Sequence, residues 1–515
     1  MADRPLISVS MIVKNEEKDL ARCLTSVAPF ADEIDVVDTG SSDRTVEIAR
    51  SFGATIHHFT WCDDFAAARN FALDRTHGEW VLHIDADEVA VVADPAALRA
   101  ELAGQPEHVL FMRTPLRNPV PDGMGYDVYG ARRIYRKHPD VRWRRPIHEC
   151  VYYVHGDRPE HDASCANLMV DHDGYMDQKV RLARGKNTRN QRILKKWMAT
   201  ADEAVDYYYL AQEYAAVGQF PTALKTVKAG IRKYRGRMRI DFQGAMYCAA
   251  MRYAMHLNRP QEAVRLGLIA TKIYAYSELS YLLGSAYLRL ENFPQAERYL
   301  ELAMAIRSRI AEFQTEAGSG SWKAMVQLAW SAWGQKNYDL AVDRSRRAHE
   351  MAPDQALTSF THGKMLLGTL KPERAVPYLR RAAEAAPTMS EARLRLSQAL
   401  VRSGDTQGAY DVLDAATREY PQKADYWQWL GELLLEAGET SACVGALARA
   451  IEHHPRHAAI YHCLGTALRR LGRYDDAVNA FALAASIDPE STGIRVSLAM
   501  AFEARAAQRA LTAVA

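Results

Sequence analysis

The 515-residue sequence predicts an α/β domain at the amino terminus followed by an all-α region built from repeats. A chain of this length exceeds one ordinary hydrophobic core, so at least two domains are expected. Short apolar runs alternate with amphipathic runs in the first part of the chain, which is typical of a mostly parallel sheet covered by helices on both faces. The remainder has no strand pattern and repeats itself with a fixed period.

The elements of the first domain follow in order from these runs. Four short apolar runs are expected to form strands, at residues 6–13, 33–38, 54–59 and 80–84. The three amphipathic runs between them are expected to form helices, at residues 17–27, 43–53 and 64–75. In such sheets ligands bind beyond the carboxyl ends of the strands. Three polar segments fall there and therefore indicate a binding site: residues 13–17, 38–43 and 85–88.

Proline and small residues mark the repeats of the second region. Five prolines stand 34 residues apart, at positions 353, 387, 421, 455 and 489. Small residues recur at two other fixed points of the period, which predicts helix pairs so close that only small side chains fit where they cross. The pattern resembles the tetratricopeptide repeat, and residues 460–489 match it almost position by position. We expect about eight repeats and a terminal capping helix at residues 491–510.

The domain boundaries predicted from these patterns enclose a basic stretch. The α/β domain is expected over residues 1–175, a basic linker helix over 176–200 and the repeats over 201–515. The net charge is only +2, yet residues 176–240 hold fifteen Lys and Arg against five Asp and Glu, and residues 132–145 hold seven against one. Two interpretations stay open: solvated faces or contacts with acidic parts of the molecule, or a surface for phosphates.

Cysteine usage and hydropathy bear on the compartment. The seven cysteines are scattered and form no CxxC pair, so zinc sites and disulfide frameworks are not expected and a reducing cytoplasm fits best. No apolar run approaches the ~20 residues that a membrane span requires. The first apolar segment is interpreted as a core strand and not as a signal peptide.

Acidic residues crowd the end of the fourth predicted strand, in WVLHIDADEV (80–89). Residues at i and i+2 of a strand point the same way, so Asp85 and Asp87 can both face one divalent cation. Mg²⁺ and Mn²⁺ prefer such oxygen ligands, often together with substrate phosphates. The alternative is that Asp85, Asp87 and Glu88 cap and open a helix. Neither interpretation gives Glu88 a separate role.

A set of motifs in fixed order connects the first domain to a known family. The motifs are SMIVKNEEKDLARCLTSV, DEIDVVDTGSSDRTVEIARSFGA, WCDDFAAARNFAL, GEWVLHIDADE, PIHE and DHDGY. With them, the domain resembles the family 2 nucleotide-sugar glycosyltransferases of the GT-A (Rossmann-like) fold. It is most similar to the bacterial branch in which this domain precedes tetratricopeptide repeats, together with relatives that glycosylate peptides.

The resemblance implies a nucleotide site at the ends of the first two strands. Asp38 would contact the base and Gly40 would let the backbone turn sharply, although a plain strand-to-helix turn explains both as well. Asn15 and Glu17 would border the base and ribose. Their alternative is a helix cap and first turn.

Cationic residues would face the donor diphosphate. The resemblance places Arg69 there, where a guanidinium suits phosphate oxygens; its alternative is an ion pair with Asp63 or Asp64. Lys186 and Arg189 could lend further charge, or could belong to a solvated helix face.

The resemblance also implies a metal shell and a general base. Asp85 and Asp87 would form the nucleotide and metal motif, and His172 would complete the shell unless it is structural. Glu149, preceded by His148, would deprotonate the acceptor. A salt bridge from Glu149 to Arg144 or Arg145 is the alternative.

The resemblance thus implies a transferase that depends on Mn²⁺ or Mg²⁺ and inverts the anomeric centre. It would move a sugar from a nucleotide-sugar donor, with a UDP-sugar favoured, to a polypeptide selected by the repeats. Two alternatives keep the chemistry and change the acceptor to a hydroxylated DNA base, or to a cell-surface glycan or lipid carrier. Another alternative is a non-catalytic scaffold. A homodimer through the repeats is also considered.

Overall fold

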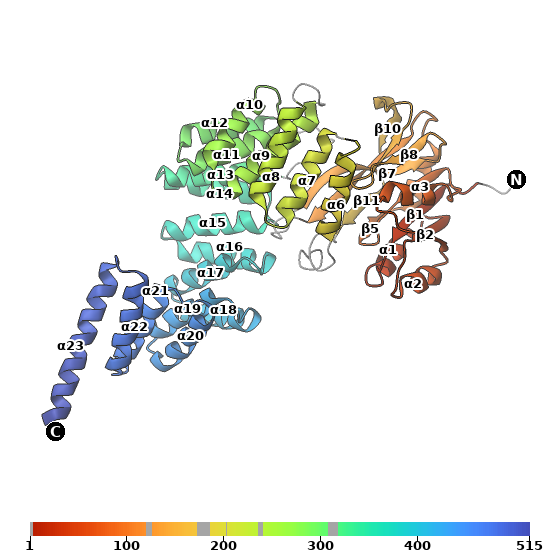
Figure 1. Cartoon of the computed structure of the whole chain (residues 1–515). Coiled ribbons are helices and arrows are strands. Elements are labelled where there is room, and N and C mark those ends of the chain that lie inside the picture. Colours follow the sequence, from red (N-terminus) through yellow and green to blue (C-terminus); the bar gives the residue numbers. More distant parts are fainter. Residues whose placement is uncertain are drawn as a thin grey trace. The chain divides into compact units, whose positions relative to one another are not determined.

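The computed structural model describes residues 4–119, 126–172, 186–201, 203–234, 240–306 and 318–514. Contacts divide the chain into two compact units, residues 1–344 and 345–515. The first unit holds all the described strands together with the first helical repeats, and the second unit is helical in its described part (Figure 1). This agrees with the predicted order of an α/β domain followed by an all-α solenoid.

A mixed sheet forms the centre of the α/β domain, with strand order β3-β2-β1-β4-β7-β6-β11-β5 and β10 paired to β6. The first four strands are parallel, as the alternating pattern predicted. β7 runs antiparallel to both β4 and β6. The sheet strands are β1 (Ile7–Val13), β2 (Glu33–Asp38), β3 (Thr55–His58), β4 (Trp80–His83), β5 (Glu88–Val91), β6 (Phe111–Pro119), β7 (Tyr126–Arg136), β10 (Asp162–Ser164) and β11 (Met169–His172); a separate hairpin joins β8 (Val141–Arg144) to β9 (Cys150–Tyr153).

Four helices accompany this sheet, and each buries some of its residues. They are α1 (Leu20–Val27), α2 (Thr45–Ser51), α3 (Phe65–Leu73) and α4 (Pro95–Ala103). The Asp64 carboxylate accepts the backbone N–H of Ala67 and caps α3. Asp94 caps α4 in the same way. Because α4 begins only after β5, the alternative that Asp85 to Glu88 open a helix is wrong.

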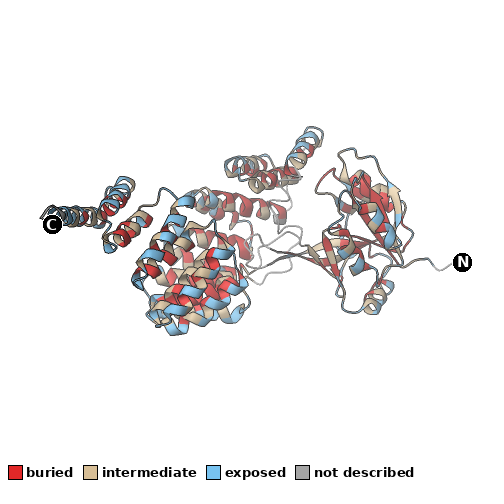
Figure 2. Ribbon diagram, turned by 90° about the horizontal axis from the view of Figure 1, so that it is seen from below, coloured by how far each residue is buried: buried red, intermediate tan, exposed pale blue. Residues whose placement is uncertain are grey.

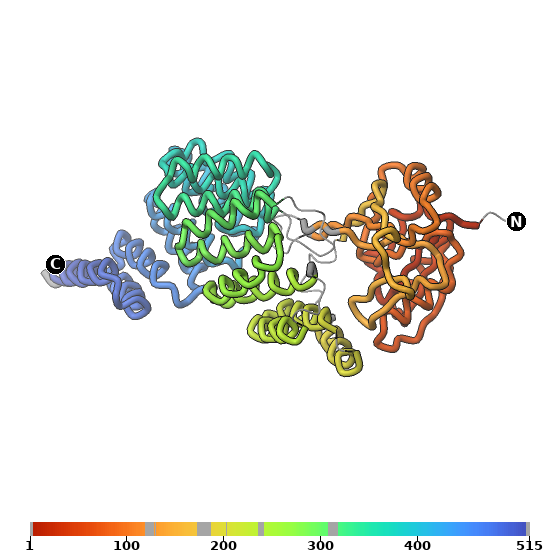
Figure 3. Tube along the Cα trace, turned by 90° about the horizontal axis from the view of Figure 1, so that it is seen from above, coloured from red at the N-terminus to blue at the C-terminus, as the bar shows by residue number. Residues whose placement is uncertain are grey.

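Helical repeats continue the first unit after residue 185. The described helices are α6 (Lys186–Met198), α7 (Ala204–Ala216), α8 (Phe220–Lys233), α9 (Ile240–His256), α10 (Pro260–Ala270), α11 (Ser277–Arg289), α12 (Phe293–Ala305), α13 (Trp322–Gly334) and α14 (Tyr338–Met351). Their trace runs up and down in successive pairs (Figure 3). Residues 173–185, which carry part of the DHDGY motif and of the basic linker, lie outside the described residues.

The second unit contains α15 (Ala356–Gly368), α16 (Pro372–Ala385), α17 (Ser390–Arg402), α18 (Thr406–Glu419), α19 (Ala424–Glu436), α20 (Thr440–His453), α21 (Ala458–Arg470), α22 (Tyr474–Ile487) and α23 (Thr492–Val514). Buried residues alternate with exposed ones along these helices (Figure 2). A Cβ added to Gly431 would lie 2.8 Å from Leu447, and one added to Gly465 would lie 2.9 Å from Phe481. Such separations are shorter than carbon contacts allow, so the predicted close crossings are confirmed.

The arginines of the basic run 132–145 form ion pairs inside the first unit. All of its arginines lie within ion-pair distance of carboxylates: Arg132 of Asp157 and Asp162, Arg133 of Glu88, Arg136 of Glu79, Arg142 of Asp74, Arg144 of Glu203 and Arg145 of Asp206. Of the two interpretations of this run, contact with acidic parts of the molecule is therefore the correct one.

Among the described helices, none has the length and apolar character needed to cross a bilayer. All seven cysteines are free thiols.

Candidate functional site

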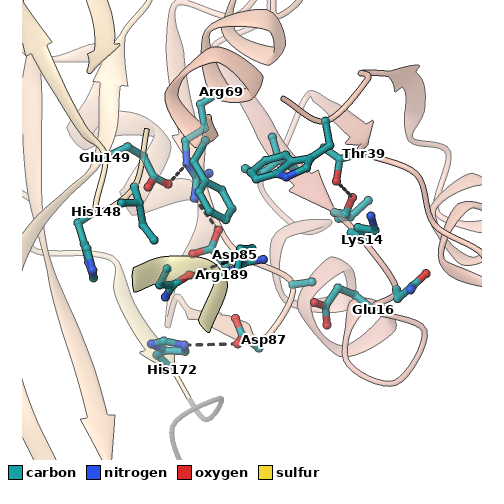
Figure 4. A pocket seen from close by; sticks show the side chains of 18 of the residues that line it. Lys14, Glu16, Thr39, Arg69, Asp85, Asp87, His148, Glu149, His172 and Arg189 are labelled. Atoms are coloured by element: carbon teal, nitrogen blue, oxygen red, sulfur yellow. Dashed lines mark hydrogen bonds and ion pairs between the residues drawn. The ribbon is translucent and has the colours of Figure 1, made fainter. Parts of the chain in front are cut away.

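A cleft of about 740 Å³ opens at the carboxyl ends of β1 and β4, where the sequence predicted a binding site. Its walls come from the loops after these strands, from α3, from the 147–149 segment and from α6 and α7. Figure 4 shows Arg69 near its centre, with Lys14, Glu16 and Thr39 on one side and His148 and Glu149 on the other. The predicted site residues that line it are Asn15, Glu17, Arg69, Asp85, Asp87, His148, Glu149, His172 and Arg189.

Arg69 connects two acids across the cleft. Its side chain is buried on α3, with Nη2 2.8 Å from Asp85 Oδ1 and Nε 2.6 Å from Glu149 Oε1. Burial opposes the charge of Arg69, but Asp85 and Glu149 outweigh it and raise the arginine pKa. In return, Arg69 and then Arg133 outweigh burial and hold the pKa of Asp85 well below its usual range. Asp85 is therefore an ionised carboxylate held in place.

The alternative partners of Arg69 are engaged elsewhere. Asp63 pairs with Arg192 on α6, and Asp64 caps α3. An ion pair between Arg69 and either acid is therefore the wrong interpretation.

Glu88 braces the loop that carries the acidic motif. Its side chain is fully buried, Oε2 accepts the backbone N–H of Asp85 at 2.9 Å, and Oε1 accepts from Arg133 on β7. Burial raises the pKa of Glu88 to about 7, with Arg133 opposing and Asp85 adding to the shift. The third acid of the motif thus fixes the backbone from which Asp85 and Asp87 project.

Asp87 and His172 form a second pair, on the floor of the cleft. His172 Nε2 lies 3.5 Å from Asp87 Oδ2, and His172 Nδ1 lies 3.0 Å from Asn118 Oδ1. Because the amide oxygen only accepts, Nδ1 carries the proton and donates. Burial acts against protonation of His172, but the hydrogen bond and charge of Asp87 prevail and raise its pKa.

These groups permit a test of the predicted metal set. Asp87 and His172 offer one oxygen and one nitrogen side by side, which fits a cation that takes its other ligands from phosphates and water. Asp85 is turned to Arg69 instead. Within the described ranges, no cluster of three or more His, Cys, Asp or Glu is arranged to hold a metal. Of the predicted set, Asp87 and His172 lie side by side, and a metal bound between them stays a prediction.

Glu149 and His148 stand at the opposite end of Arg69 from Asp85. Arg144 and Arg145 pair with Glu203 and Asp206, so the alternative salt bridge to Glu149 is wrong. The His148 ring stacks on Tyr209 of α7 with centroids 3.9 Å apart, and its Nε2 lies 3.6 Å from Glu213 Oε1.

Asn15 and Glu17 tie the loop after β1 to the loop after β2. Asn15 Oδ1 accepts the N–H of Ser42 at 2.8 Å, and Glu17 Oε2 accepts that of Arg44 at 3.2 Å. The Leu20 N–H donates to the Glu16 carbonyl at 3.0 Å, so Glu17 lies in the turn that leads into α1. The contacts of Asn15 and Glu17 with base and ribose stay a prediction.

Asp38 and Gly40 shape the turn behind these loops and do not line the cleft. The Asp38 carboxylate accepts the N–H groups of Gly40 at 3.3 Å and Ser41 at 2.9 Å. Gly40 has φ +103°, a conformation that favours glycine, which agrees with its predicted sharp turn. A contact from Asp38 to the base stays a prediction.

Of the two predicted cations on α6, Lys186 and Arg189, the structure describes the side chain of Arg189. Lys186 opens the helix, and its side chain lies outside the described part. Arg189 lines the cleft with Cζ 5.0 Å from the centroid of Phe65, and burial lowers its pKa. It is partly buried and forms no ion pair with a carboxylate of the described residues, and its contact with a diphosphate stays a prediction.

Several lining residues were not predicted, among them Trp61 from the α3 approach and Asn190 and Glu213 from α6 and α7. No local motif signals Glu213, because it reaches the cleft only through the packing of the first repeat.

Comparisons with known proteins agree with this geometry. A family model described as glycosyl transferase family 2 matches residues 8–152, and tetratricopeptide repeat models match residues 277–309, 366–433, 401–467 and 458–491.

Individual relatives are similar to parts of this chain. A TPR repeat-containing protein of Synechococcus elongatus is 32% identical over 308 residues, which are 55% of this chain and 73% of that protein. The SPbeta prophage-derived glycosyltransferase SunS of Bacillus subtilis is 26% identical over 238 residues, 45% of this chain and 55% of that protein. An uncharacterized glycosyltransferase of Rickettsia typhi is 43% identical over 147 residues, 28% of this chain and 44% of that protein. The chain thus spans about half the length of the last two relatives.

Proposed function

This chain belongs to the family 2 glycosyltransferases and carries tetratricopeptide repeats behind its transferase domain, and on that premise we propose that it moves a sugar from a nucleotide-sugar donor to a polypeptide with inversion. The observation that carries the proposal is the bridge that Arg69 makes between Asp85 and Glu149 inside the cleft. The bridge joins Asp85, an acid at a strand end on the donor side of the cleft, to Glu149, a carboxylate that can take a proton from the acceptor.

The donor nucleotide would enter at the end of the cleft formed by the loops after β1 and β2. Asn15, Glu17 and Asp43 lie there, and the hydrogen bonds between the loops fix their shape before a ligand arrives. Such preorganisation lowers the entropy cost of binding. The diphosphate would then extend toward Arg69 and Arg189, whose guanidinium groups suit its oxygens.

Asp87 and His172 would hold a divalent cation, Mn²⁺ or Mg²⁺, against that diphosphate. When bound, the cation would neutralise the charge that develops on the leaving group. The chain's own part is to orient the two ligands: Asn118 fixes the ring of His172, and Glu88 fixes the backbone of the Asp85 loop.

Glu149 would act as the general base. Arg69 holds Oε1, whereas Oε2 accepts no hydrogen bond from the described residues, so Oε2 is available for the proton of an acceptor hydroxyl or thiol. The deprotonated acceptor would attack C1 of the sugar from the face opposite the diphosphate. One displacement of this kind inverts the anomeric centre.

Helical repeats support a polypeptide as the acceptor. Solenoids of paired helices present extended surfaces that suit extended peptides, and α6 and α7 already supply part of the cleft wall.

Nucleotide binding tests the proposal directly. The melting temperature of the full chain should rise with UDP or GDP and Mn²⁺, and Asp87→Asn should abolish the rise because it removes a metal ligand. Asp140→Asn, on the β8 side away from the cleft lining, serves as the matched control and should respond like the wild type. No response from folded wild-type protein would favour a non-catalytic scaffold.

A further inference from the structure

One face of α7 contacts residues 144–148, the segment that precedes Glu149. Glu203, Asp206, Tyr209 and Glu213 are spaced by three, three and four residues, which places them on one side of the helix. Glu203 pairs with Arg144 and Arg145, Asp206 pairs with Arg145, and Tyr209 stacks on His148. Glu213 lies 3.6 Å from the same histidine ring.

The segment held by this face has an unusual backbone. Arg145 has φ 82° and His148 has φ 49°, and such left-handed conformations are uncommon for residues other than glycine. Residues persist in them where surrounding contacts determine the conformation. Here the determining contacts come from α7, because both residues have their ionic or ring partners on that helix.

Glu213 is itself held from a second helix. Asn187 and Asn190 of α6 donate to its two carboxylate oxygens at 2.9 and 2.8 Å. Burial acts against ionisation of Glu213, but His148 and Asn190 prevail and lower its pKa. A small apolar cluster of Ile147, Ile193, Leu194 and Leu210 joins the segment to both helices.

We propose that Glu213 is a positioning residue of the transferase: it fixes the His148 ring against Tyr209, and α7 thereby sets the place of the neighbouring Glu149 carboxylate. The proposal rests on the proposed function only in that Glu149 is the base. The first repeat is then a structural part of the active site and does not merely select acceptors.

Transfer kinetics supply the first readout. In the full chain, Glu213→Gln should lower kcat by about 10- to 100-fold, the size expected when a reacting group is misplaced. The KM for the donor should stay near the wild-type value, because the donor end of the cleft is untouched. Tyr209→Leu removes the stacked ring and keeps Glu213. It should also lower kcat without changing the KM for the donor, and it replaces Glu213→Gln in the test if that variant does not fold.

The matched control is Glu278→Gln. Glu278 is as buried as Glu213, at 4% exposed, and pairs with Arg252 in a later repeat without lining the cleft. A merely structural role predicts equal melting-temperature and kcat changes in both variants. If Glu213 positions the base, both variants lower the melting temperature, but only Glu213→Gln also lowers kcat.

A second readout does not depend on activity. In histidine-labelled protein, the ring resonances of His148, assigned with His148→Gln, should shift in Glu213→Gln and stay in place in Glu278→Gln. Wild-type kcat in Glu213→Gln, or unchanged His148 resonances, overturns the proposal. If the wild type turns over no donor, the proposed function fails, while the resonances still decide whether Glu213 positions His148.

Discussion

At the residue scale, the chemistry depends on how a few charges are paired across the cleft. Arg69 lies between Asp85 and Glu149, and Arg133 lies between Asp85 and Glu88 (Figure 4 shows the first pairing). Removing one partner of such a buried set leaves an uncompensated charge, which costs more than the pair contributes. These side chains therefore hold one another in position and would also hold a bound ligand.

Glu149→Gln separates the base from its structural partner. The amide can still accept from Arg69 but cannot take a proton, so kcat should fall by about 10² to 10⁴ while nucleotide binding persists. Transfer kinetics and nucleotide titration of the same protein check this. Glu160→Gln, an exposed glutamate of the same domain, is the control, and full transfer activity in Glu149→Gln would exclude it as the base.

Glu88→Gln tests the brace under the acidic motif. Loss of the buried charge opposite Arg133 should lower the free energy of unfolding by about 3 kcal/mol, measured by urea titration. Glu47→Gln removes an exposed partner of Arg44 and should change stability little. Equal stability of Glu88→Gln and wild type would show that the ion pair with Arg133 is dispensable.

Residue types and their order could be predicted from the sequence, but their pairing could not. Asp85, Asp87 and Arg69 stand in recognisable motifs. The partner of Glu88 lies 45 residues away and that of Glu149 lies 80 residues away, on elements whose approach only the folded sheet determines. The alternatives that failed, such as Arg69 with Asp63, were all sought among near neighbours in sequence.

At the element scale, the repeats share a backbone feature beyond the phased prolines. The residue after the first helix of successive repeats is left-handed at Lys336, Leu370, Gly404, Gly438 and Gly472, again 34 apart. Glycine is favoured at such helix ends because it lacks a Cβ. Leu370 therefore departs from its own repeat pattern, with 81% of its surface exposed.

Leu370→Gly should stabilise the second unit by about 1 kcal/mol, because it relieves a left-handed leucine that makes little contact. Gly404→Ala should destabilise it by a similar amount for the opposite reason. Thermal melts of both variants check the pair. Leu370→Ala, which keeps the Cβ, is the control; a destabilised Leu370→Gly would contradict the explanation.

His362 makes the second unit sensitive to acid. Burial, assisted by His349, Arg374 and Arg346, lowers the pKa of His362 from 6.5 to about 4. Between these pH values the unfolded chain binds the proton and the folded chain does not, so stability falls as the pH drops below 6.5. The loss should be on the order of 1 kcal/mol at pH 5, allowing for solvent screening.

Urea titrations at pH 7.5 and pH 5 measure this loss. His362→Gln should show a smaller pH dependence than the wild type. His454→Gln, at an exposed position, should match the wild type. If all three proteins lose the same free energy of unfolding between pH 7.5 and pH 5, His362 is not the cause.

Strands and helices with strong periodicity could be predicted from the sequence, and weaker ones could not. β1, β2, β4 and the repeat helices follow apolar patterns and phased small residues. β5 was missed because it is only four residues long and begins with a charged residue, Glu88. The burial of that charge against Arg133 depends on a strand far away in the sequence.

At the scale of the whole molecule, the transferase domain and the first repeat share one site. Glu213, Asn190 and Arg189 enter the cleft from helices that sequence patterns assign to the linker and repeats. The boundary predicted at residue 175 therefore separates two sequence patterns, but residues on both sides of it line the cleft. Periodicity reveals which helices pair, whereas contacts between unlike domains depend on individual side chains.

The central claim is that this cleft transfers a sugar to a polypeptide. Mass spectrometry of host-lysate proteins incubated with the full chain, Mn²⁺ and a panel of nucleotide sugars tests it most directly. We expect a sugar-sized mass increase on a protein with the wild type, and none with Glu149→Gln, although that variant still binds nucleotide. Sugar found only on DNA, glycan or lipid, or undiminished transfer by Glu149→Gln, would contradict the account.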